Sequence, residues 1–149
     1  MKLSGKHIVH AVPSKVWDIL MDTQSLAKVV PGISSLEKLS ENSFKSTLQI
    51  KLGPVNGSFS GNLQMDDIIE QKGFTLIAKQ NSKIGNATAT VKIGLKPFDD
   101  AQTSIEFDGD AQLSGLLASM GQRLIGGVSE TLTKQFFKNL EKELELIDS

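Results

Sequence analysis

The last third of the chain carries an unbroken series of apolar residues spaced four positions apart. Its members are Leu116, Met120, Leu124, Val128, Leu132, Phe136, Leu140 and Leu144. Since no proline interrupts the series, we expect one amphipathic helix from Ser114 to the C-terminus, about 30 residues and about 45 Å long. A repeat of four drifts against the helical turn of about 3.6 residues, so the apolar stripe winds around the helix and suits a curved partner surface.

Residues 33–113 predict the layer that this helix covers, a run of antiparallel strands separated by turn residues. In the segment 103–113, for example, apolar or small residues alternate with Ser104, Glu106 and Asp108. One face of the sheet is thus apolar and the other polar, which is the pattern of an antiparallel sheet with one face in water. The long helix is the predicted element that is large enough to cover the apolar face.

The first part of the chain predicts a strand followed by two short helices. Residues 2–9 alternate in the manner of a strand. Pro13 opens the first helix, for which we expect Ser14 to be the cap, and the second helix begins near Asp22 and ends before Pro31. Two short helices between the first strand and the remaining strands make an uncommon topology.

Length, charge and cysteine content exclude several classes of protein. The 149 residues fit one domain, which we place at residues 1–149, and the formal net charge of -1 offers no attraction for nucleic acid. The chain has no cysteine, which excludes thiol chemistry and disulfides. Residues 1–25 lack the apolar run of a signal peptide, and no segment approaches a membrane span. We therefore expect a cytoplasmic protein.

The predicted inner face of the sheet is poor in bulky side chains. Small residues stand at inward positions: Gly5, Gly61, Ala87, Ala89, Gly109 and Ala111. Because protein interiors are close-packed, small inward residues must be matched by a bend, a close neighbour or a ligand. Of the two interpretations, a ligand-sized cavity and a collapsed dry core, we favour the cavity.

A ligand in this cavity would contact the first half of the long helix and the inner face of the strands. The predicted ligand-binding residues are His7, Phe59, Leu63, Val91, Phe107, Leu117, Met120, Leu124 and Val128. The alternative for the helical residues is an ordinary core stripe. The alternative for His7 is a histidine at the rim, without contact to a ligand head group.

Gly126 and Gly127 interrupt helix propensity inside the long helix, at about 1 kcal/mol each relative to alanine. One interpretation is a hinge, or a place where the helix lets a ligand tail pass. The other is a close approach of the helix backbone to a strand, which we favour because packing is the commoner reason for such a glycine.

Charged residues near the C-terminus predict a solvated helix face. They are Lys134, Lys138, Glu141, Lys142, Glu143 and Glu145. Their mixed signs argue against a polybasic membrane anchor.

The sequence carries no pattern of a known catalytic site. We find no Ser-His-Asp order, no HExxH and no phosphate-binding glycine loop, and we expect no catalytic residue, metal or cofactor. An enzyme of the cyclase or dehydrase type would need an acid–base residue in the cavity, and His7 is the one inward candidate. A third interpretation is an assembly protein with a filled core.

The order of elements, a strand, two short helices, antiparallel strands and a long closing helix, is the α+β helix-grip arrangement. Several short motifs in this order resemble the CoxG family, named for a component of carbon monoxide dehydrogenase. They are Val16-Trp17, Val30-Pro31-Gly32, Gly53-Pro54-Val55-x-Gly57-x-Phe59-x-Gly61, and Gly121-Gln122-Arg123-Leu124 through Gly127-Val128 to Gln135-Phe136-Phe137. The resemblance covers nearly the whole chain and places it among the START-like and Bet v 1-like proteins and the polyketide cyclases.

This resemblance implies a curled antiparallel sheet closed by the long helix, with a cavity for a hydrophobic small molecule, a lipid or a quinone. It also implies an accessory role to a membrane-linked molybdenum hydroxylase such as carbon monoxide dehydrogenase. Larger family members have an extension after the closing helix, part of it for membrane attachment. Because this chain ends at Ser149, we expect peripheral contact with a membrane at most.

Overall fold

The computed structural model describes residues 1–148, which form a seven-stranded sheet with four helices. The strands are β1 (Lys2–Val9), β2 (Ile33–Ser40), β3 (Ser43–Leu52), β4 (Val55–Ile69), β5 (Gly73–Ser82), β6 (Gly85–Asp99) and β7 (Gln102–Leu113). The helices are α1 (Pro13–Met21), α2 (Thr23–Val29), α3 (Leu116–Ser119) and α4 (Gln122–Asp148). The strand order is β1-β7-β6-β5-β4-β3-β2 and every pairing is antiparallel, which confirms the predicted topology.

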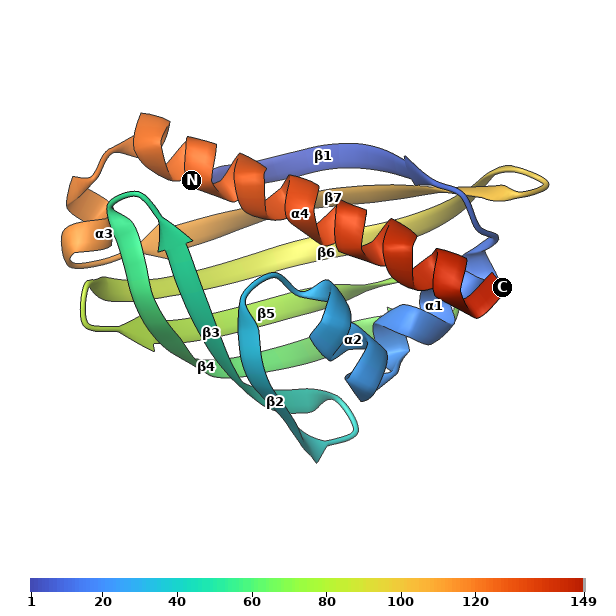
Figure 1. The fold of residues 1–149 in the computed structure, drawn as a ribbon, viewed down its shortest axis with the longest axis horizontal. Helices are drawn as coiled ribbons and strands as arrows, with labels where there is room; N and C mark the ends of the chain where they lie inside the picture. Colours follow the sequence, from blue (N-terminus) through green and yellow to red (C-terminus); the bar gives the residue numbers. More distant parts are fainter. Residues whose placement is uncertain (149) are drawn as a thin grey trace.

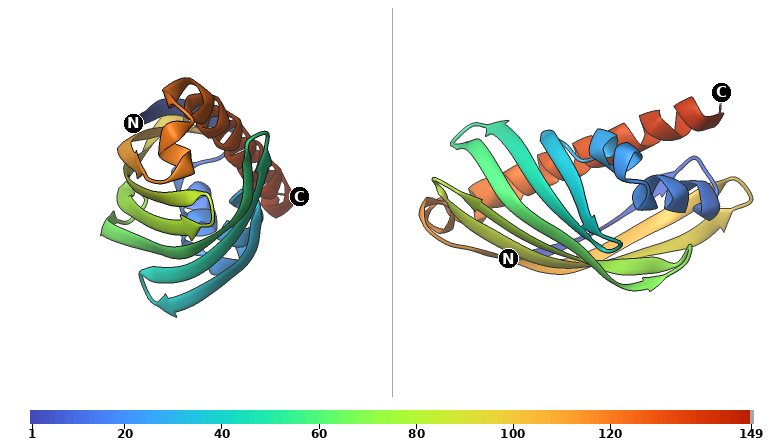
Figure 2. Two further views of the ribbon diagram at one scale, coloured as in Figure 1. Left: turned by 90° about the vertical axis from the view of Figure 1, so that its left-hand side faces the viewer. Right: turned by 90° about the horizontal axis from the view of Figure 1, so that it is seen from below.

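The sheet is strongly curled, and α4 lies across its concave side (Figure 1). Figure 2 shows the same arrangement end-on, with the strands wrapped around the space in front of the helix. The short helices α1 and α2 lie at the end of the sheet near the C-terminal half of α4 (Figure 1). The predicted curved surface beneath a long helix is therefore present.

The C-terminal helical segment differs from the prediction, because it is broken before α4. A single helix from Ser114 was expected, but the chain forms the short α3 and then turns at Gly121, whose φ is +86°. A side chain would strain the backbone at this φ, so the glycine permits the turn. Of the predicted stripe, Leu116 consequently lies outside the core with 59% of its surface exposed.

The ends of the two short helices also refine the prediction. Ser14 is not the cap of α1, because the N-cap is Val12, with Pro13 directly after it. A proline suits the first helical position, where its missing N–H would have no helical partner. The cap of α2 is Asp22, whose carboxylate accepts hydrogen bonds from the Ser25 hydroxyl at 2.8 Å and from the Ser25 amide at 3.0 Å.

Asp22→Ala is expected to lower the melting temperature at neutral pH, and the loss should shrink in acid. The Ser25 hydroxyl and amide hydrogen bonds lower the pKa of Asp22 below its ordinary 3.8. The carboxylate therefore stabilises the fold above that value, and this stabilisation is lost as the pH falls through the lowered pKa. Thermal melts from neutral pH to about pH 3 measure the effect, with Asp22→Asn as a control that keeps an acceptor at the cap. A loss that is independent of pH would contradict this account.

Buried side chains gather in two separate clusters along the concave face. The large cluster lies between α1, α2, the C-terminal half of α4 and the nearby strands, and consists of Val9, Ala11, Val16, Trp17, Ile19, Leu20, Leu26, Val29, Phe44, Met65, Phe74, Leu95, Ile105, Phe137, Leu140 and Leu144. The small cluster lies at the opposite end and consists of Ile50, Val55, Phe59, Leu117 and Ile125. The interior is thus packed at its two ends.

Three of the small inward residues have close neighbours that explain them. A side chain at Gly61 or Gly109 would collide with a backbone carbonyl of the adjacent strand, that of Lys79 or Thr90. A side chain at Gly5 would lie 2.6 Å from the ring of Phe107. These glycines therefore permit the tight curl of the sheet and do not by themselves indicate a cavity.

Candidate ligand-binding site

Between the two clusters, the concave face carries small residues that no cluster includes. We call them the central band: Ala78, Ala87, Ala89, Val91 and Gly109. They lie on adjacent strands, because Ala78 stands opposite Ala89 and Val91 stands opposite Gly109. All five are half-buried although they point toward the helix side of the sheet. The middle of the covered face thus retains accessible apolar surface, which is the character of a small-molecule site.

A first groove runs between β1 and α4 and has a volume of about 970 Å³. Seven consecutive residues, Met1 to His7, line one side, so the groove follows the edge of the strand and not one of its faces. β1 is the terminal strand of the sheet, which leaves this edge without a neighbouring strand among the described residues. Gly126, Ser129 and Thr133 contribute small side chains from the helix side. We call this the β1–α4 groove.

A second groove lies on the other flank of α4, beside the turn between β3 and β4. Its volume is about 630 Å³. Its lining consists of Leu52, Gly53, Pro54, Met120, Arg123, Leu124, Gly127, Val128 and Thr131. We call this the β3–β4 groove. The N-terminal half of α4 therefore has an open groove on each side.

The structure contradicts the favoured explanation of the glycine pair. A close approach of the helix to a strand was expected, but an added methyl group at Gly126 or Gly127 would meet no heavy atom within 4 Å. Gly126 instead lines the β1–α4 groove, and Gly127 lines the β3–β4 groove. Packing therefore does not require either glycine, and the hinge or ligand-passage interpretation remains.

The predicted ligand-binding residues fall into several places around the central band. Phe59 and Leu117 are buried in the small cluster, and Met120 and Val128 pack against it. Met120, Leu124 and Val128 also line the β3–β4 groove. His7 and Phe107 line the β1–α4 groove, Leu63 packs against the large cluster and Val91 belongs to the central band. The residues thus surround the accessible middle of the concave face without forming one contiguous wall.

His7 lies at the rim of the β1–α4 groove and is exposed. Its ring stacks on Phe137 of α4, with centroids 4.3 Å apart and an angle of 15° between the planes. Phe107 stands next to this pair, 6.2 Å from Phe137. The three rings join β1, β7 and α4 at the end of the groove where the large cluster begins.

Comparison with known proteins agrees with this architecture. The sequence profile of CoxG, the G component of carbon monoxide dehydrogenase, matches residues 5–145. The chain belongs to the CoxG family. No curated protein matches it at a significant level.

Solved structures give the CoxG-family chain the START/Bet v 1-like helix-grip fold. A conserved protein from Geobacillus kaustophilus superposes with a TM-score of 0.94 at 30% identity, over 97% of this chain and 95% of that one. A START superfamily protein from Mycobacterium smegmatis gives 0.75 at 13% identity, over 98% of both chains. The Zhui aromatase/cyclase from Streptomyces sp. R1128 gives 0.71 at 12% identity, over 97% and 93%. At these lower identities the likeness concerns the fold alone.

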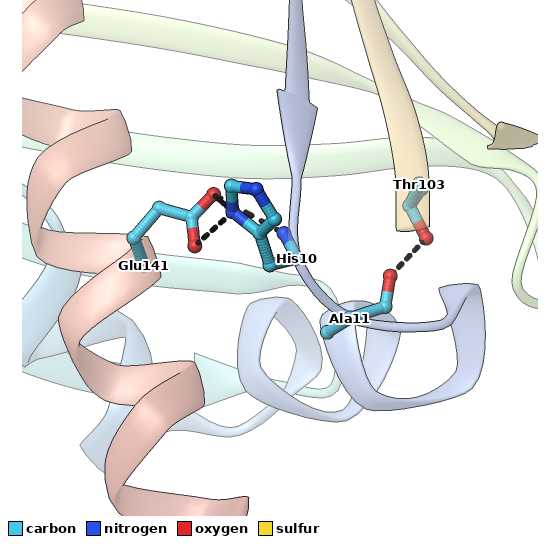
Figure 3. Close-up of polar contacts among 4 residues, drawn as sticks. All are labelled: His10, Ala11, Thr103 and Glu141. Atoms are coloured by element: carbon cyan, nitrogen blue, oxygen red, sulfur yellow. Dashed lines mark hydrogen bonds and ion pairs between the residues drawn. The ribbon is translucent and has the colours of Figure 1, made fainter. Parts of the chain in front are cut away.

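In this CoxG-family protein, charged residues of α4 fasten the helix to the N-terminal elements. Glu141 accepts a hydrogen bond from the His10 amide at 3.2 Å, and its carboxylate lies 3.3 Å from the His10 ring nitrogen (Figure 3). Glu143, with 12% of its side chain exposed, lies 3.8 Å from the ammonium of Lys28. Thr103 of β7 donates to the Ala11 carbonyl at 2.6 Å in the same region (Figure 3). The prediction of a purely solvated face was therefore wrong for Glu141 and Glu143.

The structure also brings together two polar residues that no sequence motif singled out. Ser46 and Gln80 are buried on the concave face, with 1% and 7% of their surface exposed. Their positions share the inward phase of Phe44 on β3 and of Phe74 on β5. A polar residue in the apolar phase of a strand was the available signal. Which two such residues meet depends on strand register, which the sequence does not reveal.

Two further properties concern the whole described chain. Within residues 1–148, no group of three or more histidine, aspartate or glutamate side chains is arranged to hold a metal ion. Of the helices in this range, none combines the length and apolar character that crossing a bilayer requires.

Proposed function

We propose that the protein binds an elongated hydrophobic molecule, a lipid or a quinone, between its curled sheet and helix α4. The observation that carries this proposal is the central band, an accessible apolar surface between two packed clusters on the covered face of the sheet. Affinity would come mainly from burial of apolar surface, at about 25 cal/mol per Å² before the ordering costs of binding. The two grooves beside the N-terminal half of α4 are the routes by which the ligand would reach this surface.

The family suggests where this ligand would be used. Membership of the CoxG family supports an accessory role to a molybdenum hydroxylase such as carbon monoxide dehydrogenase. The chain would then deliver or shield the ligand while docked on that enzyme. Peripheral contact with a membrane would give access to an apolar cargo.

Protein purified from its own host is expected to retain a stoichiometric apolar ligand. Native mass spectrometry would show the added mass, and solvent extraction followed by identification would assign it to an isoprenoid quinone or a lipid. Recombinant protein from an unrelated host is the control, because it reports which ligands bind without specificity. A clean apo mass, together with no thermal shift on adding quinones or fatty acids, would contradict the proposal and favour an assembly protein with a filled core.

An enzyme of the cyclase or dehydrase type is the second candidate. The likeness in fold to an aromatase/cyclase is consistent with it. Such a reaction needs an acid–base group beside the ligand, and His7, at the rim of the β1–α4 groove, is the inward-phase residue that offers one. Loss of turnover in His7→Ala, with ligand binding retained, would support this candidate over a carrier.

A further inference from the structure

Ser46 and Gln80 form a polar pair in the middle of the concave face. They stand on β3 and β5, and the residue opposite both of them on the intervening β4 is Gly61. Strands two places apart are separated by about 9.6 Å, which the two side chains can bridge only if nothing stands between them. Because Gly61 has no side chain, Gln80 Nε2 reaches Ser46 Oγ at 3.1 Å. The glycine thus both permits the curl and lets the pair form.

The hydrogen-bonding capacity of this pair is incompletely used. Besides the 3.1 Å bond, Ser46 Oγ lies 3.4 Å from Gln80 Oε1, and Gln80 Nε2 lies 3.5 Å from the Asn62 carbonyl oxygen. Both of these distances exceed the usual range of about 2.7–3.2 Å. A primary amide offers two donors and an acceptor with two lone pairs, and a hydroxyl offers one donor. Burying such groups without full partners costs free energy, which a ligand group with the right chemistry would recover.

The pair borders the least filled part of the interior. Gln80 stands opposite Ala87, and the next inward row places Leu63 opposite Ala78 and Ala78 opposite Ala89. All four of these neighbours are half-buried. A ligand lying on the central band would therefore have Ser46 and Gln80 at one side of it.

The surroundings of the pair are uncharged. The buried polar side chains of the described residues are Ser46, Gln80, Thr103 and Ser104, and none carries a charge. The charged neighbours in sequence, Lys45 and Lys79, are exposed on the outer face of the sheet. An ionised carboxylate placed beside Gln80 would lose its hydration without gaining a counter-ion, which costs several kcal/mol. A neutral hydroxyl or carbonyl group incurs no such penalty.

We propose that Ser46 and Gln80 are the polar recognition site for the ligand and that they select a neutral head bearing a hydroxyl or carbonyl group. The pair would exchange donor and acceptor contacts with that head while the chain lies along the central band. This inference rests on the proposed ligand binding and specifies its chemistry, since it excludes ionised fatty acids as the preferred cargo.

Three probes with the same chain and different heads test the proposal: hexadecanol, palmitate and hexadecane. Their affinities would be measured by displacement of an uncharged fluorescent dye from the full-length protein at mildly alkaline pH. Hexadecanol is expected to bind about tenfold more tightly than either of the other two, which is the effect of one satisfied neutral hydrogen bond in a buried site. Equal affinity for all three probes, or a preference for palmitate, would overturn the head-group assignment alone. Displacement by none of them would overturn the ligand binding as well.

Gln80→Met preserves side-chain length and removes the amide, so it is expected to weaken hexadecanol binding about tenfold and to leave hexadecane unchanged. Ser46→Ala is the second variant, and a smaller loss in the same direction is expected. Gln49→Met is the matched control, because Gln49 Nε2 donates to Ser58 Oγ at the same 3.1 Å but on the exposed outer face. Unchanged hexadecanol affinity in both Gln80→Met and Ser46→Ala, with all proteins folded, would refute the assignment.

Discussion

Leu140→Ala is expected to lower the free energy of unfolding by about 3 kcal/mol, whereas Leu132→Ala, two turns earlier in α4, should lower it by about 1 kcal/mol. Leu140 is fully buried in the large cluster, where neighbouring side chains cannot collapse into the space that a deleted isobutyl group would leave. Leu132 is half-buried beside the small cluster, so its truncation removes fewer contacts. Urea denaturation of both variants measures the two losses.

The comparison separates a carrier from a protein with a filled core. Leu116→Ala is the control for the substitution itself, because Leu116 is exposed and its loss should change stability by less than about 0.5 kcal/mol. If Leu132→Ala cost as much as Leu140→Ala, the interior beneath the first half of α4 would be as tightly filled as the large cluster. The accessible central band, and with it the proposed ligand site, would then be refuted.

Periodicity predicted most of the fold, because it reports directly on which residues face the core. The alternation from Lys2 to Val9 and the strands through Leu113 are present, and the apolar stripe of α4 covers the concave face. The break at Gly121 escaped notice because the stripe continues through it, and the spacing of apolar residues carries no information on φ. A glycine just after a helical turn is a known stop signal, so local chemistry could have located the end of α3.

The site was less predictable because its residues meet through register and curvature. His7 stacks on Phe137 across the length of the chain, and no local pattern links them. Gly61 was interpreted as missing bulk, whereas it permits both close strand approach and the contact between Ser46 and Gln80. The inward phase of a strand can be read from sequence, but the partner that stands opposite each residue follows from strand pairing.

The double variant Gly126→Ala, Gly127→Ala is expected to unfold about 2 kcal/mol less readily than the wild type, with a melting temperature about 4–8 °C higher. Alanine favours the helix by about 1 kcal/mol at each position, because glycine loses more backbone freedom on folding. The added methyl groups would meet no heavy atom within 4 Å, so no clash offsets this gain. Thermal and urea denaturation measure the gain, and Ser129→Ala, in the same helix and at the same groove, is the control for a change that adds no methyl to a glycine.

A sequence that retains two glycines where alanine would fit gives up stability at that place, and such losses are commonest where function needs motion. Both glycines lie between the two grooves through which a ligand would reach the central band. If the pair is a hinge, the stiffened double variant should bind hexadecanol with nearly unchanged affinity but release it several-fold more slowly in stopped-flow dye displacement. Higher stability with an unchanged release rate would refute the hinge. A loss of stability would show instead that the wild-type helix needs glycine geometry at these two positions, and the interpretation of an open, mobile segment of α4 would fall with it.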